Sequence, residues 1–277
     1  MMKPRFSHWA ATLAVALAAW TSPAAHATVI VADNFDAYTA GSSLNDLNGG
    51  NGAWTSAWST TGFQNIVTSG EGNMLQVGTG TKFSGGDNAT YRSFEGYSGN
   101  TLFASVTLTA TAGYDTDDAN DFFTFWLDNA ASGNHGNVPN TGFDSDGNVV
   151  GRISSSYSID GGPVVQGTTY TLVIEVSKSG ANGSNYDTIR FWMNPSYGDL
   201  GTPVGTVTHD INRSELSMLG LRIINNEQDN VYQVDNIVVG TEWADVVAVP
   251  EPSPLAFVSV GTMLLVGATG MRMRKAD

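Results

Sequence analysis

The segment TLFASVTLTAT, residues 101–111, carries the clearest structural signal in the chain. Its residues at positions 102, 104, 106, 108 and 110 are all apolar, and most of the residues between them are Ser or Thr. Because successive side chains of a β-strand point to opposite faces, this alternation predicts a strand with one face in a core. Further β-branched and aromatic stretches are DFFTFWLDN (121–129), TTYTLVIEVSKS (168–179), YDTIRFWMNP (186–195), LSMLGLRIIN (216–225) and VYQVDNIVVGTEW (231–243).

Turn-forming sequences separate these stretches, among them DSDGN, IDGGP, GDLGTP and NNEQDN. About a dozen short strands at this spacing, without a helix longer than two turns, predict an all-β sandwich or jelly roll. The chain contains no cysteine. Its stability therefore depends on packing rather than on disulfides.

The first 27 residues have the three parts of a secretory signal peptide. Lys3 and Arg5 precede an apolar stretch over 9–20, and Ala25 and Ala27 form a small-x-small cleavage site. We expect signal peptidase to cleave there, so that the exported chain begins near Thr28.

The last 29 residues, 249–277, combine a Pro-Glu-Pro triplet, an apolar span over 255–271 and a basic end. This order resembles the PEP-CTERM sorting signal of exported bacterial proteins, which implies transient anchoring in the membrane and processing by an exosortase. A plain C-terminal membrane anchor is the alternative, although about 17 residues is short for a spanning helix. The residues that carry the resemblance are Pro250, Glu251, Pro252, Arg272, Arg274 and Lys275.

The body between these ends, residues 28–248, resembles the concanavalin A-like and laminin-G-like jelly rolls. The resemblance rests on DNFDAYTAGSSL near its start, IRFWMNPSYGDLGTP in its middle and VYQVDNIVVGTEWADV at its end. It implies one domain in which the first and last strands lie side by side.

The chain is acidic, with a formal net charge of −14. Without the two terminal segments, 7 basic and 24 acidic residues remain, a charge of −17. Phosphate backbones would repel such a body, so nucleic acid is excluded as a partner.

No catalytic motif is evident. Glycoside hydrolases of this fold use two carboxylates at alternate positions of one strand, followed by a third. Glu175 has no acidic neighbour at position 177, and Glu227 and Asp229 fall in a predicted turn. His135 and His209, the two histidines of the body, lie in loop-like sequence without a nucleophile elbow. We therefore expect a protein that is not an enzyme, with a glycan-active hydrolase or lyase as the alternative.

Calcium is the metal that the oxygen-rich side chains favour. One hypothesis joins Asp33 and Asp235, because pairing of the first and last strands would bring their carboxylates together. The alternative is a pair of exposed aspartates at strand ends. Two local candidates are DTDDAND, with Asp115, Asp117, Asp118 and Asp121, and DSDGN, with Asp144, Asp146 and Asn148, which an Asp-Gly hairpin turn also explains.

Glycan binding would use aromatic rings on a sheet face. Trp126 shares a face with Phe122 and Thr124, and Trp192 shares one with Arg190. These mixed faces indicate a partly wetted surface and make Trp126, Trp192 and Arg190 candidates for contact with sugar. Packing in the core or at its rim is the alternative, because a sandwich of this size needs large aromatic residues inside.

Together these features predict an exported surface or extracellular-matrix protein, without enzymatic activity, that associates with extracellular polysaccharide. A purely structural adhesion module remains the third possibility.

Overall fold

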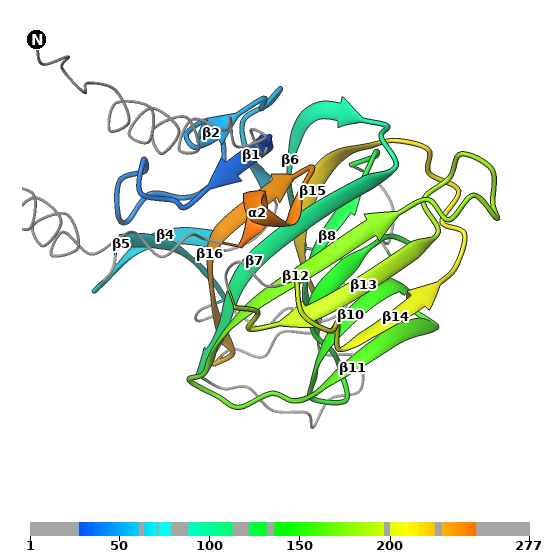
Figure 1. Ribbon diagram of the computed structural model, residues 1–277. Helices are drawn as coiled ribbons and strands as arrows, with labels where there is room; N and C mark the ends of the chain where they lie inside the picture. The colour runs from blue at the N-terminus through cyan, green and yellow to red at the C-terminus, as the bar shows by residue number, and fades with distance from the viewer. Residues whose placement is uncertain are drawn as a thin grey trace, which may run out of the picture.

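The computed structural model describes residues 28–60, 64–70, 72–78, 88–112, 122–131, 136–196, 200–224 and 229–247, and of residues 88 and 89 only the backbone. The predicted signal peptide and sorting tail, with Ala25, Ala27 and the Pro-Glu-Pro triplet, lie outside these ranges. In the described part, two antiparallel sheets pack face to face (Figure 1). The prediction of an all-β sandwich of the jelly-roll type is confirmed.

The nine-stranded sheet faces the viewer in Figure 1. Seven of its strands follow one path, and a hairpin of two further strands joins it at β16. The path runs β14 (Gly205–Thr208), β13 (Thr188–Met193), β12 (Thr169–Ser177), β7 (Thr101–Ala112), β16 (Val231–Gly240), β1 (Val29–Asp33) and β2 (Asn51–Gly52), and the hairpin consists of β5 (Gly72–Val77) and β4 (Gln64–Ser69).

The seven-stranded sheet lies behind it (Figure 1). Its strand order is β11 (Tyr157–Pro163), β10 (Asn148–Ser154), β9 (Asn140–Phe143), β8 (Phe122–Asp128), β15 (Leu216–Ile224), β6 (Asn88–Tyr97) and β3 (Ser59–Thr60).

Strand β7 confirms the alternation seen in the sequence. Its apolar residues at positions 102, 104, 106, 108 and 110 are all fully buried in the main core between the sheets. The intervening Ser and Thr side chains therefore lie on the outer face of the nine-stranded sheet. The two neighbours of β7 are β12 and β16, which places it inside the sheet.

The first and last strands of the sandwich pair, as the jelly-roll resemblance implies. β1 runs antiparallel to the C-terminal half of β16, with Asp33 opposite Ile237. The N-terminal half of β16 pairs instead with β5. A register shift between Asp235 and Val238 separates the halves, and Asn236 there adopts a left-handed φ of 49°. This irregularity decides which face each side chain of β16 reaches.

A four-residue helix, α2 (Trp243–Val246), follows β16 and lies on the outer face of the nine-stranded sheet (Figure 1). With Val247, it covers a second apolar cluster that contains Phe103, Val173 and Trp192. Within the described ranges, no helix is long and apolar enough to cross a membrane. The span predicted over 255–271 is not among those residues.

Candidate functional site on the nine-stranded sheet

Asp33, one half of the predicted calcium pair, is buried and bound by protein donors. Its Oδ2 accepts hydrogen bonds from Arg92 Nη1 at 3.1 Å, from the Tyr38 hydroxyl at 2.5 Å and from Trp58 Nε1 at 2.9 Å. Its Oδ1 accepts the backbone N–H of Phe35 at 3.0 Å. The charge of Asp33 is therefore balanced by an arginine, without need of a cation.

Arg92 reaches Asp33 from the opposite sheet, where it occupies an inward position of β6. Its guanidinium also donates to the carbonyls of Gly49 and Ser56 and to Asn48 Oδ1, and it lies 4.1 Å from the ring centroid of Trp54. Burial lowers the pKa of Arg92, while the charge of Asp33 opposes that shift. Burial, followed by the charge of Asp33, raises the pKa of Tyr38. This ion pair fastens the loop after β1 to both sheets.

Asp235 does not join Asp33. It lies opposite Thr107 on the outer face of the sheet, whereas Asp33 lies opposite Ile237, whose side chain is in the core. The irregularity at Asn236 is the cause. In a regular strand, side chains three positions apart point to opposite faces, but here Val234 and Ile237 both enter the core. The strands pair as expected, but the two carboxylates lie on opposite faces, and the hypothesis of a shared calcium ion is corrected.

The DSDGN stretch forms the turn between β9 and β10. Asp144 Oδ1 accepts the backbone N–H groups of Asp146 and Asn148, and Gly147 has a left-handed φ of 79°. The hairpin interpretation therefore holds for this stretch. Among the described residues, no group of three or more His, Asp or Glu side chains is placed to hold a metal ion. The DTDDAND stretch falls outside them.

Trp126 lies on the face that the sequence indicated. Phe123, Phe125 and Leu127 enter the main core, while Trp126 belongs to the opposite, outer face of the seven-stranded sheet. It is nevertheless fully buried. A ring with no accessible surface cannot stack on a sugar, so the glycan-contact role predicted for Trp126 is not supported by its position.

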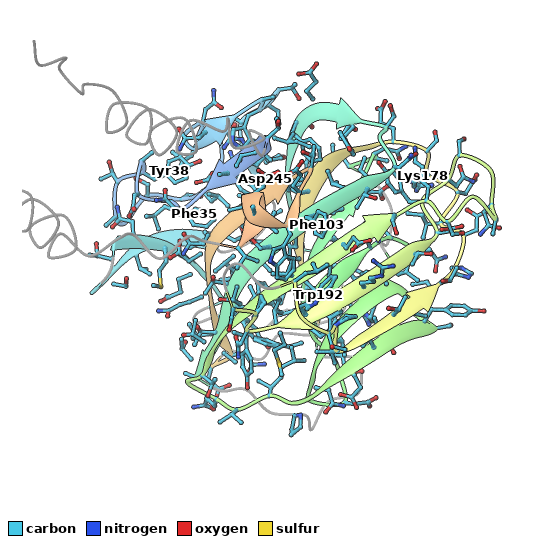
Figure 2. The ribbon with its side chains drawn as sticks, viewed as in Figure 1. Phe35, Tyr38, Phe103, Lys178, Trp192 and Asp245 are labelled. Atoms are coloured by element: carbon cyan, nitrogen blue, oxygen red, sulfur yellow. The ribbon has the colours of Figure 1, made fainter. Side chains whose placement is uncertain are left out.

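Trp192 and Arg190 occupy the outer face of the nine-stranded sheet. Trp192 is 4% exposed and packs against Trp243 of α2, with 5.1 Å between ring centroids. Arg190 is about half exposed and forms an ion pair with Glu175 at 3.2 Å. Figure 2 labels Asp245 on the short helix, and Phe103 and Trp192 on the sheet beside it.

Two joined hollows cross this outer face, and we call them the transverse groove. The first is about 220 Å³ and lies over β1 and β16. The second is about 450 Å³ and continues over β7 and β12, with α2 as one wall. They share Ala32, Asn236 and Val238. The first is further lined by Asp33, Asn34, Asn51 and Ile237, and the second by Val29, Ser105, Thr107, Thr171, Asp245 and Val246.

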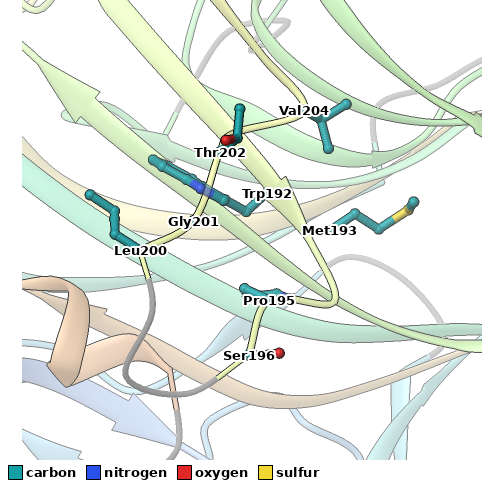
Figure 3. Close-up of a pocket in the computed structure, with 8 residues that line it drawn as sticks. All are labelled: Trp192, Met193, Pro195, Ser196, Leu200, Gly201, Thr202 and Val204. Atoms are coloured by element: carbon teal, nitrogen blue, oxygen red, sulfur yellow. The ribbon is translucent and has the colours of Figure 1, made fainter.

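The groove runs across the strands because the register aligns its lining residues. Val238 lies opposite Ser105, and Thr107 lies opposite Thr171. The first of these rows continues through Val173 to Trp192. A third hollow of about 180 Å³ begins there, and Figure 3 shows the Trp192 ring beside Leu200, Gly201 and Thr202. Val173 and Trp192 are buried beneath α2, so this third hollow is separate from the transverse groove.

The chemistry of the transverse groove is polar without being highly charged. Ser105, Thr107 and Thr171 offer hydroxyl groups, and Asn236 offers an amide. Asp245 Oδ2 accepts the backbone N–H groups of Thr241 and Glu242, while its Oδ1 is buried and has no hydrogen-bond partner among the described residues. Groups that both donate and accept thus alternate with the apolar surface of Val238 and Val246.

Sequence reasoning missed the transverse groove and the Asp33–Arg92 ion pair. The groove needs α2 as a wall, and no local pattern predicts where a four-residue helix docks. The sequence does contain one sign of the ion pair. Arg92 alternates along its strand with Thr90 and Phe94, which are both buried, so Arg92 points to the same face as they do. A charged residue at an inward strand position requires a buried partner.

No protein-family model matches this chain, and no curated protein sequence matches it. Among solved structures, lectin II from Ulex europaeus aligns with a TM-score of 0.46 at 14% identity, covering 77% of this chain and 99% of the lectin. An endo-1,3-beta-glucanase from Streptomyces sioyaensis aligns with a TM-score of 0.47 at 16% identity, covering 79% and 98%. A carbohydrate esterase from the Shiga toxin-encoding bacteriophage phi24B aligns with a TM-score of 0.41 at 14% identity, covering 67% and 90%. These proteins are similar to this chain in the arrangement of their strands.

Proposed function

We propose that this protein is an exported, non-enzymatic carbohydrate-binding protein and that the transverse groove receives the glycan. The observation that carries the proposal is the cross-strand row of hollows, which places Ser105, Thr107, Thr171 and Asn236 beside apolar side chains. Carbohydrates present hydroxyl groups that donate and accept hydrogen bonds, next to apolar C–H surfaces. A site for them needs a few well-placed polar groups in a largely apolar concave surface.

The length of the groove favours a chain over a single sugar. The two joined hollows span four strands, which lie about 4.8 Å apart in a sheet. An extended polysaccharide would therefore lie across the strands.

The carboxylates favour binding over hydrolysis. Hydrolysis of a glycosidic bond uses two carboxyl groups on either side of the bond. Among the described residues that line the transverse groove, Asp33 and Asp245 carry carboxylates, and Arg92 neutralises the first inside the sandwich. Asp245 Oδ2 is bound by two backbone N–H groups and its Oδ1 is buried, so the described lining residues do not offer two accessible carboxylates.

A glycan array combined with a hydrolysis screen tests this function. We expect the purified protein to bind one or more polysaccharides and to release no reducing ends from them. Release of sugar fragments would assign the protein to the glycan-active enzymes instead. Absence of binding to every polysaccharide tested would favour a purely structural adhesion module.

The terminal segments support the export route. We infer that signal peptidase cleaves near Thr28 and that an exosortase processes the tail near Pro250, leaving the body at the cell surface or in the extracellular matrix. Mass spectrometry of the exported protein should find a C-terminus near Pro250. An intact tail ending at Asp277 would show that the tail is retained as an anchor.

A further inference from the structure

Uncharged polar side chains dominate the lining of the transverse groove. Apart from two carboxylates, its polar side chains are hydroxyl groups and amides, from Asn34, Asn51, Ser105, Thr107, Thr171 and Asn236. Each of these groups can both donate and accept a hydrogen bond. The lining therefore suits a ligand whose own polar groups are uncharged donors and acceptors.

The two carboxylates of the lining already have donors within the protein. Asp33 forms a buried ion pair with Arg92 at 3.1 Å. Asp245 lies on α2 (Figure 2), where its Oδ2 accepts two backbone N–H groups and its Oδ1 is buried. The groove thus does not need a cationic ligand to balance its carboxylates.

The positive charge of the body lies outside the groove lining. Six of the seven basic residues of the body are described, and none of these six lines the groove: Arg92, Arg152, Lys178, Arg190, Arg213 and Arg222. Arg190, on the same face of the sheet, is held by Glu175 in an ion pair. The seventh basic residue, Lys82, is not among the described residues.

The surroundings of the groove are acidic. The body has a net charge of −17, Asp235 lies on the same sheet face opposite Thr107, and the exposed Glu242 precedes α2. Like charges repel, and the repulsion is stronger at a protein surface than in bulk water. An anionic polysaccharide would meet this repulsion without a basic side chain in the described lining to offset it.

We propose that the transverse groove selects an uncharged polysaccharide and discriminates against a chain that carries carboxylates. This inference rests on the proposed function, since it names the class of glycan that the same groove receives. Hydroxyl groups and amides of the lining hydrogen-bond the sugar hydroxyls, and the acidic surroundings exclude anionic chains.

Hydroxyethylated and carboxymethylated forms of one polysaccharide are the matched probes, because the two substituents are similar in size and only the second is charged. Dextran, galactomannan and xyloglucan supply three backbones, each immobilised in both forms. We expect the purified protein to bind at least one hydroxyethylated form, and to bind the carboxymethylated form of that backbone at least about tenfold more weakly at low salt. High salt should reduce this difference by screening the repulsion, and should leave binding of the uncharged form unchanged.

Val29→Lys tests whether the groove itself sets the preference. Val29 lines the groove and is 42% exposed, so a lysine there places a cation at the rim. Val165→Lys is the control, because Val165 is 57% exposed, is not a lining residue, and gives the body the same added charge. We expect Val29→Lys to raise the affinity for the carboxymethylated form about fivefold or more, and Val165→Lys and Lys82→Gln to bind like the wild type. Melting curves should show that every variant is folded.

The Thr107→Val/Thr171→Val variant separates failure of this inference from failure of the proposed function. Equal or tighter binding of the carboxymethylated form, still weakened in the double variant, would overturn the uncharged class and leave glycan binding in the groove intact. Equal effects of the two lysine substitutions would show that net charge sets the preference, and would overturn the assignment to the groove. Binding that the double variant does not weaken, or no binding to any form, would overturn the proposed function and this inference with it.

Discussion

Replacing Arg92 by Met tests the buried ion pair that fastens the loop after β1. The substitution keeps much of the aliphatic stem and removes the charge. It leaves the Asp33 carboxylate buried without its counter-charge and leaves the Gly49 and Ser56 carbonyls without the guanidinium donor. Both side chains of the pair are at most 1% exposed, so solvent cannot compensate for the loss.

Removing one partner of a buried ion pair costs about 3–5 kcal/mol. In a body of this length, a loss of 1 kcal/mol lowers the melting temperature by about 2–4 °C. We therefore expect Arg92→Met to melt roughly 6–20 °C below the wild type. Urea unfolding followed by tryptophan fluorescence gives the free energy directly.

Arg190→Met is the matched control, because its ion pair with Glu175 has an arginine that is 47% exposed. Glu175 itself is buried, so the control should lose some stability, but less than Arg92→Met, because solvent reaches the guanidinium side of this pair and screens it. In the double variant Asp33→Asn/Arg92→Met, no buried charge remains, and the loss should be smaller than the sum of the two single losses. A loss below about 1 kcal/mol for Arg92→Met would refute the inference that this ion pair holds the loop.

Three further predictions concern other parts of the sandwich. Burial alone would raise the pKa of Asp187, but hydrogen bonds from Ser179, Thr188 and Asn182 outweigh it and hold the pKa below its ordinary value. Asp187 therefore stabilises the fold above the unfolded pKa of about 3.9. This stability is lost as the pH falls through the lower folded pKa, so the free-energy difference between wild type and Asp187→Asn should be largest near neutral pH and shrink in acid. Gly220→Ala should lower the unfolding free energy by about 1–3 kcal/mol or more, because its Cβ would lie 2.4 Å from Trp126 Cζ2 and 2.3 Å from the Thr90 carbonyl oxygen. Gly70→Ala is the control and should have little effect, because a Cβ at Gly70 would meet open space. Asp33 is already paired with Arg92, so Asp235 is not expected to bind calcium with it. The melting temperature in calcium minus that in chelator should therefore be the same for Asp235→Ala and the wild type. If Asp235→Ala abolished a difference that the wild type shows, the calcium hypothesis would be restored.

Local alternation predicted the strands well. The core face of β7 and the outward placement of Trp126, Trp192 and Arg190 all follow from period-2 spacing. What covers those outward faces could not be predicted, because Trp192 is buried by a helix 50 residues further along the chain. Contacts between distant segments leave no local signature.

The calcium hypothesis shows the same limit at a single residue. Pairing of the first and last strands was predicted correctly, yet the left-handed backbone at Asn236 moves Asp235 to the opposite face from Asp33. In a sheet, one inserted residue reverses the facing of every side chain on one side of the insertion. Asparagine tolerates this conformation better than most residues, but its presence in VYQVDNIVVG did not by itself mark the irregularity.

Binding of a polysaccharide in the transverse groove is tested most directly by the affinity of a Thr107→Val/Thr171→Val variant for the glycan that the wild type binds. The substitution keeps the shape of both side chains and removes two hydroxyl groups that face each other in the groove. At about 1 kcal/mol for each lost hydrogen bond, the affinity should fall about 30-fold. Thr206→Val/Thr208→Val, at exposed positions of β14 in the same sheet, should bind like the wild type. Equal affinity of both double variants and the wild type would contradict binding in the groove.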